Sequence, residues 1–323
     1  TDSTGLKGFI YYTTDPAKLG EASIEKDGKI TVYSTLENAL EKSAAEDTIT
    51  LLKDVQVEDA ISIAKSLTIN GNQKTITYAP STAAGDAKDK ANFITVTASN
   101  VTIQDATIDA EGAKNAVHFY LVTGGMLDSV TVKGGAYTSV LVNGSAVTVK
   151  DSVMNPNTDA HANIEYGMGS GVKQIPNITL DNVSGDTKMP LVYVDNDTLN
   201  AVKTNTDSLT ENSSSKDVID VINKTLIGTQ LTVDDEGNIV APQTYTITNG
   251  HDITTIPAAT TTNNEGKLAT LSPLEKDGRY TFAGWYTAAS GGEKVTTDTV
   301  FTKDTTLYAH WNYSSGGGGG GGV

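Results

Sequence analysis

The sequence predicts an all-β protein whose larger part is a solenoid, a coil of stacked parallel strands. Three observations predict this fold class. Strands of similar character recur along the middle of the chain, residues typical of strands and turns dominate the composition, and the last fifth of the chain follows a different pattern. A chain of 323 residues is long enough for two domains. We therefore expect a solenoid followed by a smaller unit.

The repeated strand is the strongest of these signals. Four segments share its character, and one position in each aligns as Ile103, Leu127, Val149 and Leu180. Successive members are separated by 24, 22 and 31 residues. A period near two dozen residues with β-branched strands is typical of a coiled solenoid. In such a coil, equivalent inward residues stack on one another, so Val101, Ile103, Ala106 and Ile108 should lie under Leu127, Val130 and Val132.

The composition excludes several classes of function. The formal net charge is −16, so phosphate backbones and anionic lipid surfaces would repel the chain, and we expect no nucleic-acid partner and no membrane insertion. Arg279 is the only arginine, which disfavours arginine clamps for phosphate or carboxylate. The absence of cysteine excludes disulfides, thiolate chemistry and cysteine-based zinc sites. No apolar run approaches the length of a membrane span.

Residues 1–33 are expected to form short N-terminal strands. The pair 22–25 and 30–33 should form a hairpin, because Asp27-Gly28 between them is a strong hairpin signal. A helix should begin near Ser34, with Ser34 and Glu37 as a capping box. Leu36, Ala39 and Leu40 give this helix one apolar stripe. Such a helix can cover the open end of a strand coil.

This helix is followed by "DTITLLKDV…AISIAKSLTINGNQKTIT", and the order resembles the N-terminal end of right-handed parallel β-helix proteins of the pectin-lyase-like superfamily. The resemblance covers residues 34–197 and implies a right-handed parallel β-helix with a capping helix, but it implies almost nothing about activity. The matching residues, besides the later repeats, are Leu36, Ala39, Ile49, Leu51, Val55, Ile61, Ile63, Leu67, Ile69 and Gly71.

Residues 198–242 break the repeat and are expected to cap the far end of the coil and connect it onward. Residues 216–226 place apolar side chains at helical spacing. The segments 231–233 and 238–240 flank an acidic, glycine-containing turn and predict a hairpin.

Residues 243–313 predict a separate small module with the core "GRYTFAGWYTAASGGEKVTTDTVFTKDTTLYAHW". This segment resembles the Listeria–Bacteroides repeat, the internalin-type B-repeat of Gram-positive surface proteins. The resemblance implies a β-rich, β-grasp-like module on a secreted or wall-attached bacterial protein. The matching residues are Gly278, Tyr280, Phe282, Gly284, Trp285, Tyr286, Gly291, Gly292, Asp304, Thr306, Leu307, Tyr308, Ala309 and Trp311.

Residues 314–323 contain seven consecutive glycines and read as a flexible tether. Such a tether predicts cell-wall attachment through sequence beyond Val323, and an expression tag is the alternative interpretation.

Enzymes of the pectin-lyase-like fold need particular residues. Its lyases use a Lys or Arg base, often with Ca²⁺ held by carboxylates, and arginine is absent from the predicted coil. Its polygalacturonase-like hydrolases use a cluster of three aspartates. Only the tripeptide Asn157-Thr158-Asp159 resembles part of that motif. These three are also ordinary turn residues, which is the interpretation we favour. Catalysis is therefore less expected than binding.

Counting from the aligned positions places two outward rows on one face of the coil. The first row is Tyr120, Asn143, Glu165 and Asp195, and the second is His118, Leu141, Asn163 and Tyr193. Glu165 and Asp195 would then be about 5 Å apart, the separation of a retaining glycosidase pair. Two carboxylates this close would also suit a Ca²⁺ ion. The simpler interpretation is that outward rows of any solenoid are polar.

Trp285 and Trp311 are the only tryptophans. They could form a platform for sugar rings, but a module of this size needs large apolar side chains in its core, and we expect both to lie there.

These patterns together predict a non-catalytic extracellular surface protein of a Gram-positive bacterium, engaged in adhesion or glycan binding. Its ligand-binding candidates are His118, Tyr120, Asn143 and Tyr193, and its expected partners are host or plant glycans or surface proteins. No cofactor is expected, with Ca²⁺ at Glu165 and Asp195 as the alternative. The competing functions are a polysaccharide-active enzyme using Glu165 and Asp195, and a purely structural stalk.

Overall fold

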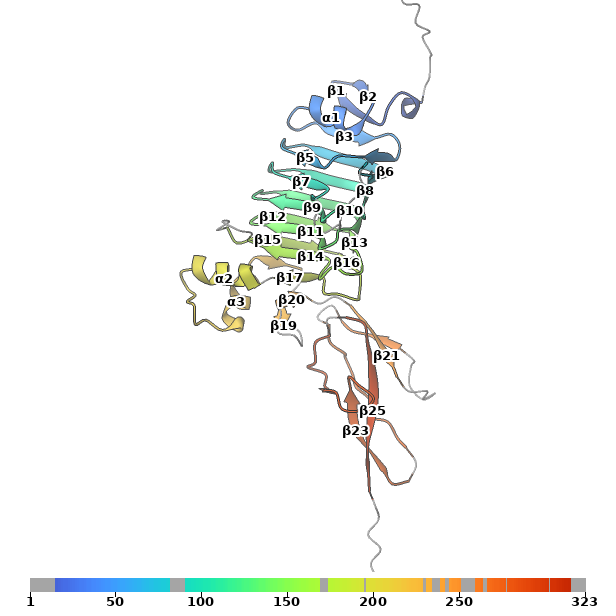
Figure 1. Cartoon of the computed structure of the whole chain (residues 1–323), viewed down its shortest axis with the longest axis vertical. Coiled ribbons are helices and arrows are strands. Elements are labelled where there is room, and N and C mark those ends of the chain that lie inside the picture. The colour runs from blue at the N-terminus through green and yellow to red at the C-terminus, as the bar shows by residue number, and fades with distance from the viewer. Residues whose placement is uncertain are drawn as a thin grey trace, which may run out of the picture.

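A computed structural model describes most of the chain, and Figure 1 shows it as an elongated molecule with strands stacked along its long axis. The described residues are 15–81, 91–168, 174–194, 196–228, 231–233, 239–241, 244–250, 259–263, 266–276, 278–301 and 303–314. Residues 315–323 of the predicted tether and residues 1–14 of the predicted N-terminal strands lie outside these ranges.

Two sheets in the described residues form the larger part, which we call the strand stack. One sheet has twelve strands, most of them paired in parallel. They are β1 (Ala22–Lys26), β2 (Lys29–Tyr33), β3 (Thr48–Leu51), β4 (Val55–Val57), β6 (Thr68–Tyr78), β8 (Thr102–Ala110), β10 (Gly125–Gly134), β12 (Ala146–Lys150), β13 (Val153–Asn155), β15 (Asn177–Asp181), β16 (Ser184–Gly185) and β18 (Leu226–Ile227).

The other sheet has eight strands in the described part of the chain. They are β5 (Ile61–Ile63), β7 (Ile94–Val96), β9 (Asn115–Tyr120), β11 (Thr138–Asn143), β14 (Ile164–Gly167), β17 (Val192–Val194), β19 (Thr232–Val233) and β20 (Ile239–Ala241). From β3 to β17 the chain passes back and forth between the two sheets, and each return adds strands parallel to those before. The fold is mostly β, and its parallel sheets are compatible with the predicted β-helix.

The predicted register in the twelve-stranded sheet is confirmed. Leu127 pairs with Ile103 on one side and Val149 on the other, and Val149 pairs with Leu180. Val130 and Val132 pair with Ala106 and Ile108. Ile103, Leu127 and Val149 are fully buried, because inward residues of adjacent strands cover one another between the two sheets.

A repeated bend interrupts these strands at one equivalent position. Asp105, Ser129, Asp151 and Asn182 all have positive φ, between 46° and 57°. Asn and Asp tolerate this left-handed conformation better than most residues, which explains three of the four positions. The bend turns each strand toward the next segment without breaking the sheet.

The N-terminal end of the stack matches its predicted elements, with one correction. β1 and β2 form the predicted hairpin through Asp27 and Gly28, and β1 also pairs with β3. A 3₁₀ turn, η1 (Pro16–Lys18), precedes this hairpin. Helix α1 (Leu36–Lys42) follows it and buries Leu36 and Ala39. The predicted capping box was wrong, because Thr35 is the N-cap and its side chain accepts a hydrogen bond from the Asn38 N–H.

Two helices lie beside the far end of the stack (Figure 1). Helix α3 (Ser215–Ile222) was predicted, and Ser214 and Asp217 form its capping box. Helix α2 (Asn196–Asn205) was not predicted, because its Asn, Asp and Thr residues are weak helix formers. The predicted hairpin is present as β19 and β20, and β20 also pairs antiparallel with β17. The acidic turn between β19 and β20 lies outside the described residues.

The C-terminal module has its own five-stranded sheet and its own core in the described residues. Its strands are β21 (Thr246–Asn249), β22 (Ala259–Thr261), β23 (Tyr280–Tyr286), β24 (Lys294–Val295) and β25 (Thr305–Tyr313). Asp304 joins the module to the stack. Its carboxylate accepts hydrogen bonds from the Thr187 hydroxyl at 2.6 Å and the Thr246 N–H at 2.7 Å, and its own N–H donates to the Thr187 carbonyl. β25 then runs away from the stack (Figure 1).

Candidate glycan-binding face

The outer face of the eight-stranded sheet contains most of the predicted site residues. The inward residues Val117, Phe119, Val142, Ile164 and Val194 are all buried, as predicted. Successive side chains of a strand point to opposite faces, so their neighbours lie on the outer face. Tyr120 is exposed there, His118, Glu165 and Tyr193 are partly exposed, and Asn143 is almost buried.

The predicted rows on this face were partly wrong. Tyr120 does pair with Asn143, but Asn143 then pairs with Gly167. Glu165 instead continues the row of His118 and Leu141, and its partner on β17 is Tyr193. The predicted row is thus shifted by two residues between β11 and β14. A shift of two leaves every side chain on its expected face, so the alternating pattern could not reveal it.

The predicted carboxylate pair is only half described. Asp195 lies outside the described residues, and Tyr193 occupies the position beside Glu165. Glu165 has a different partner, because its Oε2 lies 3.0 Å from Nε2 of His161. The side chain of Glu165 is 16% exposed and that of His161 is 39% exposed, so the pair is open to a ligand from the His161 side.

We call Lys114, Tyr137, His161, Glu165 and Tyr193 the ring cluster. The His161 ring lies 4.9 Å from the Tyr193 ring and 5.7 Å from the Tyr137 ring, measured between centroids. The Lys114 ammonium lies 5.1 Å from the Tyr137 centroid. The cluster therefore places three partly exposed rings, a carboxylate and an ammonium on or just before neighbouring strands.

Tyr137 and His161 follow the repeat of the stack, although neither was predicted as a site residue. The His161 N–H donates to the Tyr137 carbonyl, and the Tyr137 N–H donates to the Lys114 carbonyl. These residues thus occupy equivalent positions on successive turns, 23 and 24 residues apart. They precede the strands rather than lying within them, so the alternation of residues along the strands did not predict them.

His118 lies at the centre of a separate amide network. Its Nδ1 lies 2.9 Å from Nδ2 of Asn92, and its Nε2 lies 2.8 Å from Oδ1 of Asn143. An amide nitrogen can only donate and an amide oxygen can only accept, so the neutral ring has its proton on Nε2. Burial lowers the pKa of His118 below its ordinary value of 6.5, and this outweighs the opposing effects of Asn143 and Glu165. His118 is therefore a neutral, fixed hydrogen-bonding group at pH 7.

The lowered pKa of His118 predicts a loss of stability in acid. Because the pKa of His118 is lower in the folded protein, the unfolded chain binds more protons at this position below about pH 6.5. The free energy of unfolding should therefore fall as the pH drops through that value. His118→Gln removes the titrating ring and should lose less stability on acidification than the unmodified chain. Urea unfolding at about pH 7.5 and about pH 5 measures both differences.

His161→Gln is the matched control for this prediction, because His161 is also on the outer face but is more exposed. Equal acid sensitivity of His118→Gln and the unmodified chain would contradict the prediction.

The polar and aromatic groups of this face can be compared with the needs of a metal ion and of a sugar. Among the described residues, no group of three or more His, Asp or Glu side chains is placed to hold a metal ion. Calcium at Glu165 and Asp195 stays a prediction, because it involves a residue that is not described. Aromatic rings with polar edges beside fixed amides and a carboxylate match the apolar faces and hydroxyl edges of sugars.

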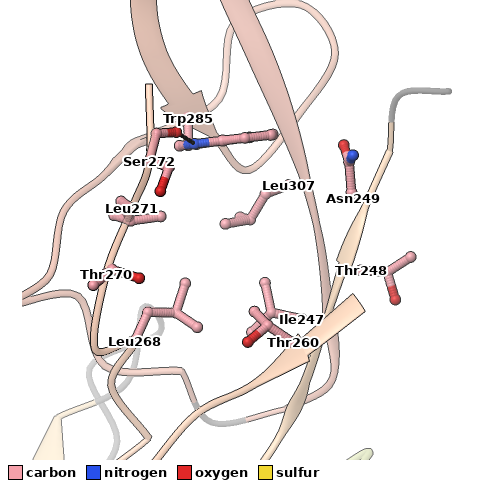
Figure 2. A pocket seen from close by; sticks show the side chains of 10 residues that line it. All are labelled: Ile247, Thr248, Asn249, Thr260, Leu268, Thr270, Leu271, Ser272, Trp285 and Leu307. Carbon is pink, nitrogen blue, oxygen red and sulfur yellow. Dashed lines mark hydrogen bonds between the residues drawn. The ribbon is translucent and has the colours of Figure 1, made fainter. Parts of the chain in front are cut away.

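The C-terminal module contains a hollow between β21, β22 and the segment from Leu268 to Ser272 (Figure 2). Its volume is about 170 Å³, and its lining combines leucine and isoleucine side chains with threonine hydroxyls. Trp285 closes one side and donates its indole N–H to the Ser272 carbonyl at 3.0 Å. Trp285 is buried, as predicted for a core residue, whereas Trp311 is only half-buried.

Comparison with known proteins assigns part of the chain. Residues 231–310 match the family model of the Listeria-Bacteroides repeat domain, so this part of the predicted resemblance is confirmed. The match begins inside the segment that was expected to cap the stack. Neither the curated proteins nor the solved structures contain a match to the chain. The described residues include no helix long and apolar enough to cross a membrane.

Proposed function

We propose that this chain is a non-catalytic extracellular surface protein of a Gram-positive bacterium that binds glycans through the ring cluster. In this proposal the strand stack is a right-handed parallel β-helix of the pectin-lyase-like kind, and the C-terminal module holds it at the cell surface. The Listeria-Bacteroides repeat occurs in surface proteins, which supports the location. The single observation that supports glycan binding is the group of three partly exposed rings, Tyr137, His161 and Tyr193, with Glu165 beside the His161 ring.

Each group of the ring cluster has a role in the proposal. Tyr137 and Tyr193 lie on opposite sides of His161 and would contact the apolar faces of sugar rings. Glu165 would accept hydrogen bonds from sugar hydroxyls, and charge-assisted bonds of this kind are stronger than neutral ones. Strands about 4.8 Å apart fix the spacing between these groups, so a sugar chain along the stack would meet them in succession.

The test is a glycan array of host and plant polysaccharides, followed by titration of any glycan that binds. Tyr193→Ala and Glu165→Gln should each weaken binding by about tenfold, which corresponds to about 1.4 kcal/mol of binding free energy. Glu58→Gln is the matched control for the lost charge, because Glu58 is exposed and lies in the segment between β4 and β5. Binding that is equal in all variants, or absent for every glycan, would contradict the proposal.

The competing functions give different results in the same experiments. A polysaccharide-active enzyme would release reducing sugars, and Glu165→Gln would abolish that release. A stalk would neither bind nor cleave any glycan, and its variants at Tyr193 would behave like the unmodified chain.

A further inference from the structure

The module contains a cross-strand aromatic group at the end distant from the stack. Tyr280 pairs with Tyr313, and Phe282 pairs with Trp311, across the antiparallel strands β23 and β25. The ring centroids are 5.2 Å apart in the first pair and 5.6 Å apart in the second. Residues two apart on a strand share a face, so all four rings lie on one face of the ribbon. We call this group the aromatic ribbon.

The ribbon passes from the core of the module into solvent. Phe282 and Trp311 pack against the buried cluster of the module. Tyr280 is 41% exposed and Tyr313 is 57% exposed. A large part of each tyrosine is therefore open to solvent and available to a ligand.

Two cations lie on the same ribbon. The Lys276 ammonium is 4.3 Å from the Tyr280 centroid and 5.4 Å from the Trp311 centroid. Nη1 of Arg279 lies 3.4 Å from the Tyr313 hydroxyl. Within the described residues no ion pair involves either cation, although the exposed Glu275 adjoins Lys276 in sequence. The chain's only arginine is thus placed beside Tyr313, an exposed tyrosine.

We propose that the aromatic ribbon is a binding site for an acidic polysaccharide. Sugar rings of the ligand stack on Tyr280 and Tyr313, and their carboxylate or sulfate groups pair with Lys276 and Arg279. Arginine is suited to this role because its guanidinium fork matches two oxygens of one acidic group. Lys276 already lies over two rings, so an acid bound to it is held next to the stacking surface.

The net charge of −16 does not prevent this interaction. Charges more than about 10 Å away are largely screened at an ionic strength of about 0.1 M, so a ligand at the ribbon meets mainly the nearby charges. These include Lys276 and Arg279, and also the acidic Glu275 and Asp277 that adjoin Lys276 in sequence.

The site is independent of the proposed face on the strand stack, and the test keeps the two apart. The full chain is titrated with an oligogalacturonate, a heparin-derived oligosaccharide and the neutral oligosaccharide maltohexaose. At least one acidic oligosaccharide should bind, the neutral one should not, and raising NaCl from about 0.05 M to about 0.5 M should weaken binding.

The double variant Lys276→Gln/Arg279→Gln and the single variant Tyr313→Ala should each weaken binding of the acidic oligosaccharide by about tenfold or more. Tyr313 is exposed, so its loss should leave thermal unfolding nearly unchanged. Lys303→Gln is the matched control, because Lys303 is exposed and lies next to Asp304 at the opposite end of β25. Tyr193→Ala, on the strand stack, should bind the acidic oligosaccharide normally.

Three results would overturn the proposal. They are binding of neither acidic oligosaccharide, equal binding of the neutral one, and unchanged affinity in both ribbon variants. Loss of binding in Tyr193→Ala with full binding in the ribbon variants would assign the acidic ligand to the ring cluster instead.

Discussion

Replacing Leu127 with alanine is expected to destabilise the protein by about 2–5 kcal/mol, the largest effect of any substitution proposed for this chain. Leu127 is fully buried and pairs with Ile103 on one side and Val149 on the other. Both neighbours are inward residues of adjacent strands, so the shortened side chain leaves a cavity between three strands. Neighbouring inward side chains cannot shift to fill that cavity, because the register of the strands fixes their positions.

Equilibrium unfolding in guanidinium chloride measures this effect as a shift of the midpoint. Leu121→Ala is the matched control, because Leu121 is 48% exposed and should cost less than about 0.5 kcal/mol. A loss below about 1 kcal/mol for Leu127→Ala would mean that this position is not in the core.

Replacing Tyr166 with phenylalanine is expected to destabilise the protein by about 1–3 kcal/mol. Tyr166 is fully buried, and its hydroxyl lies 2.9 Å from both the Pro176 carbonyl oxygen and Oγ1 of Thr225. Burial raises the pKa of Tyr166 well above its usual range, so the hydroxyl stays protonated and donates. The substitution keeps the ring but leaves polar groups buried without this partner, at the point where the stack meets the segment after α3.

The same unfolding experiment tests Tyr166→Phe, with Tyr120→Phe as the control. Tyr120 is 39% exposed on the outer face, so water can replace the lost hydroxyl and little change is expected. Equal midpoints for the two variants would show that the buried hydroxyl contributes nothing to stability.

Much of the fold could be predicted from the sequence because it depends on local patterns. The hairpin at Asp27-Gly28 needs two residues that tolerate positive φ, and both are present. The inward residues of the strands follow from alternation alone. Helix α2 could not be predicted, because its stability comes from contacts such as the buried Val202 rather than from helix propensity.

The candidate site was less predictable, and Glu165 shows why. Alternation correctly assigned its face, but its row depends on the length of the connection between β13 and β14. That length changes the register by two residues and leaves the alternation unaltered. His161 was missed for a related reason, since it lies before a strand and becomes a partner of Glu165 only through the bend that follows it.

The sequence alone was enough to predict which strand residues face inward and where the Listeria-Bacteroides repeat lies. It could do so because each of these depends on residues close together in the chain. His161 and Glu165, and likewise Lys276 and Tyr280, are only four residues apart in the chain. The contacts of His161 with Tyr193 and of Lys276 with Trp311 join distant segments, and the tertiary structure alone defines them. The pairing of those segments is set by inter-strand hydrogen bonds that no local pattern specifies.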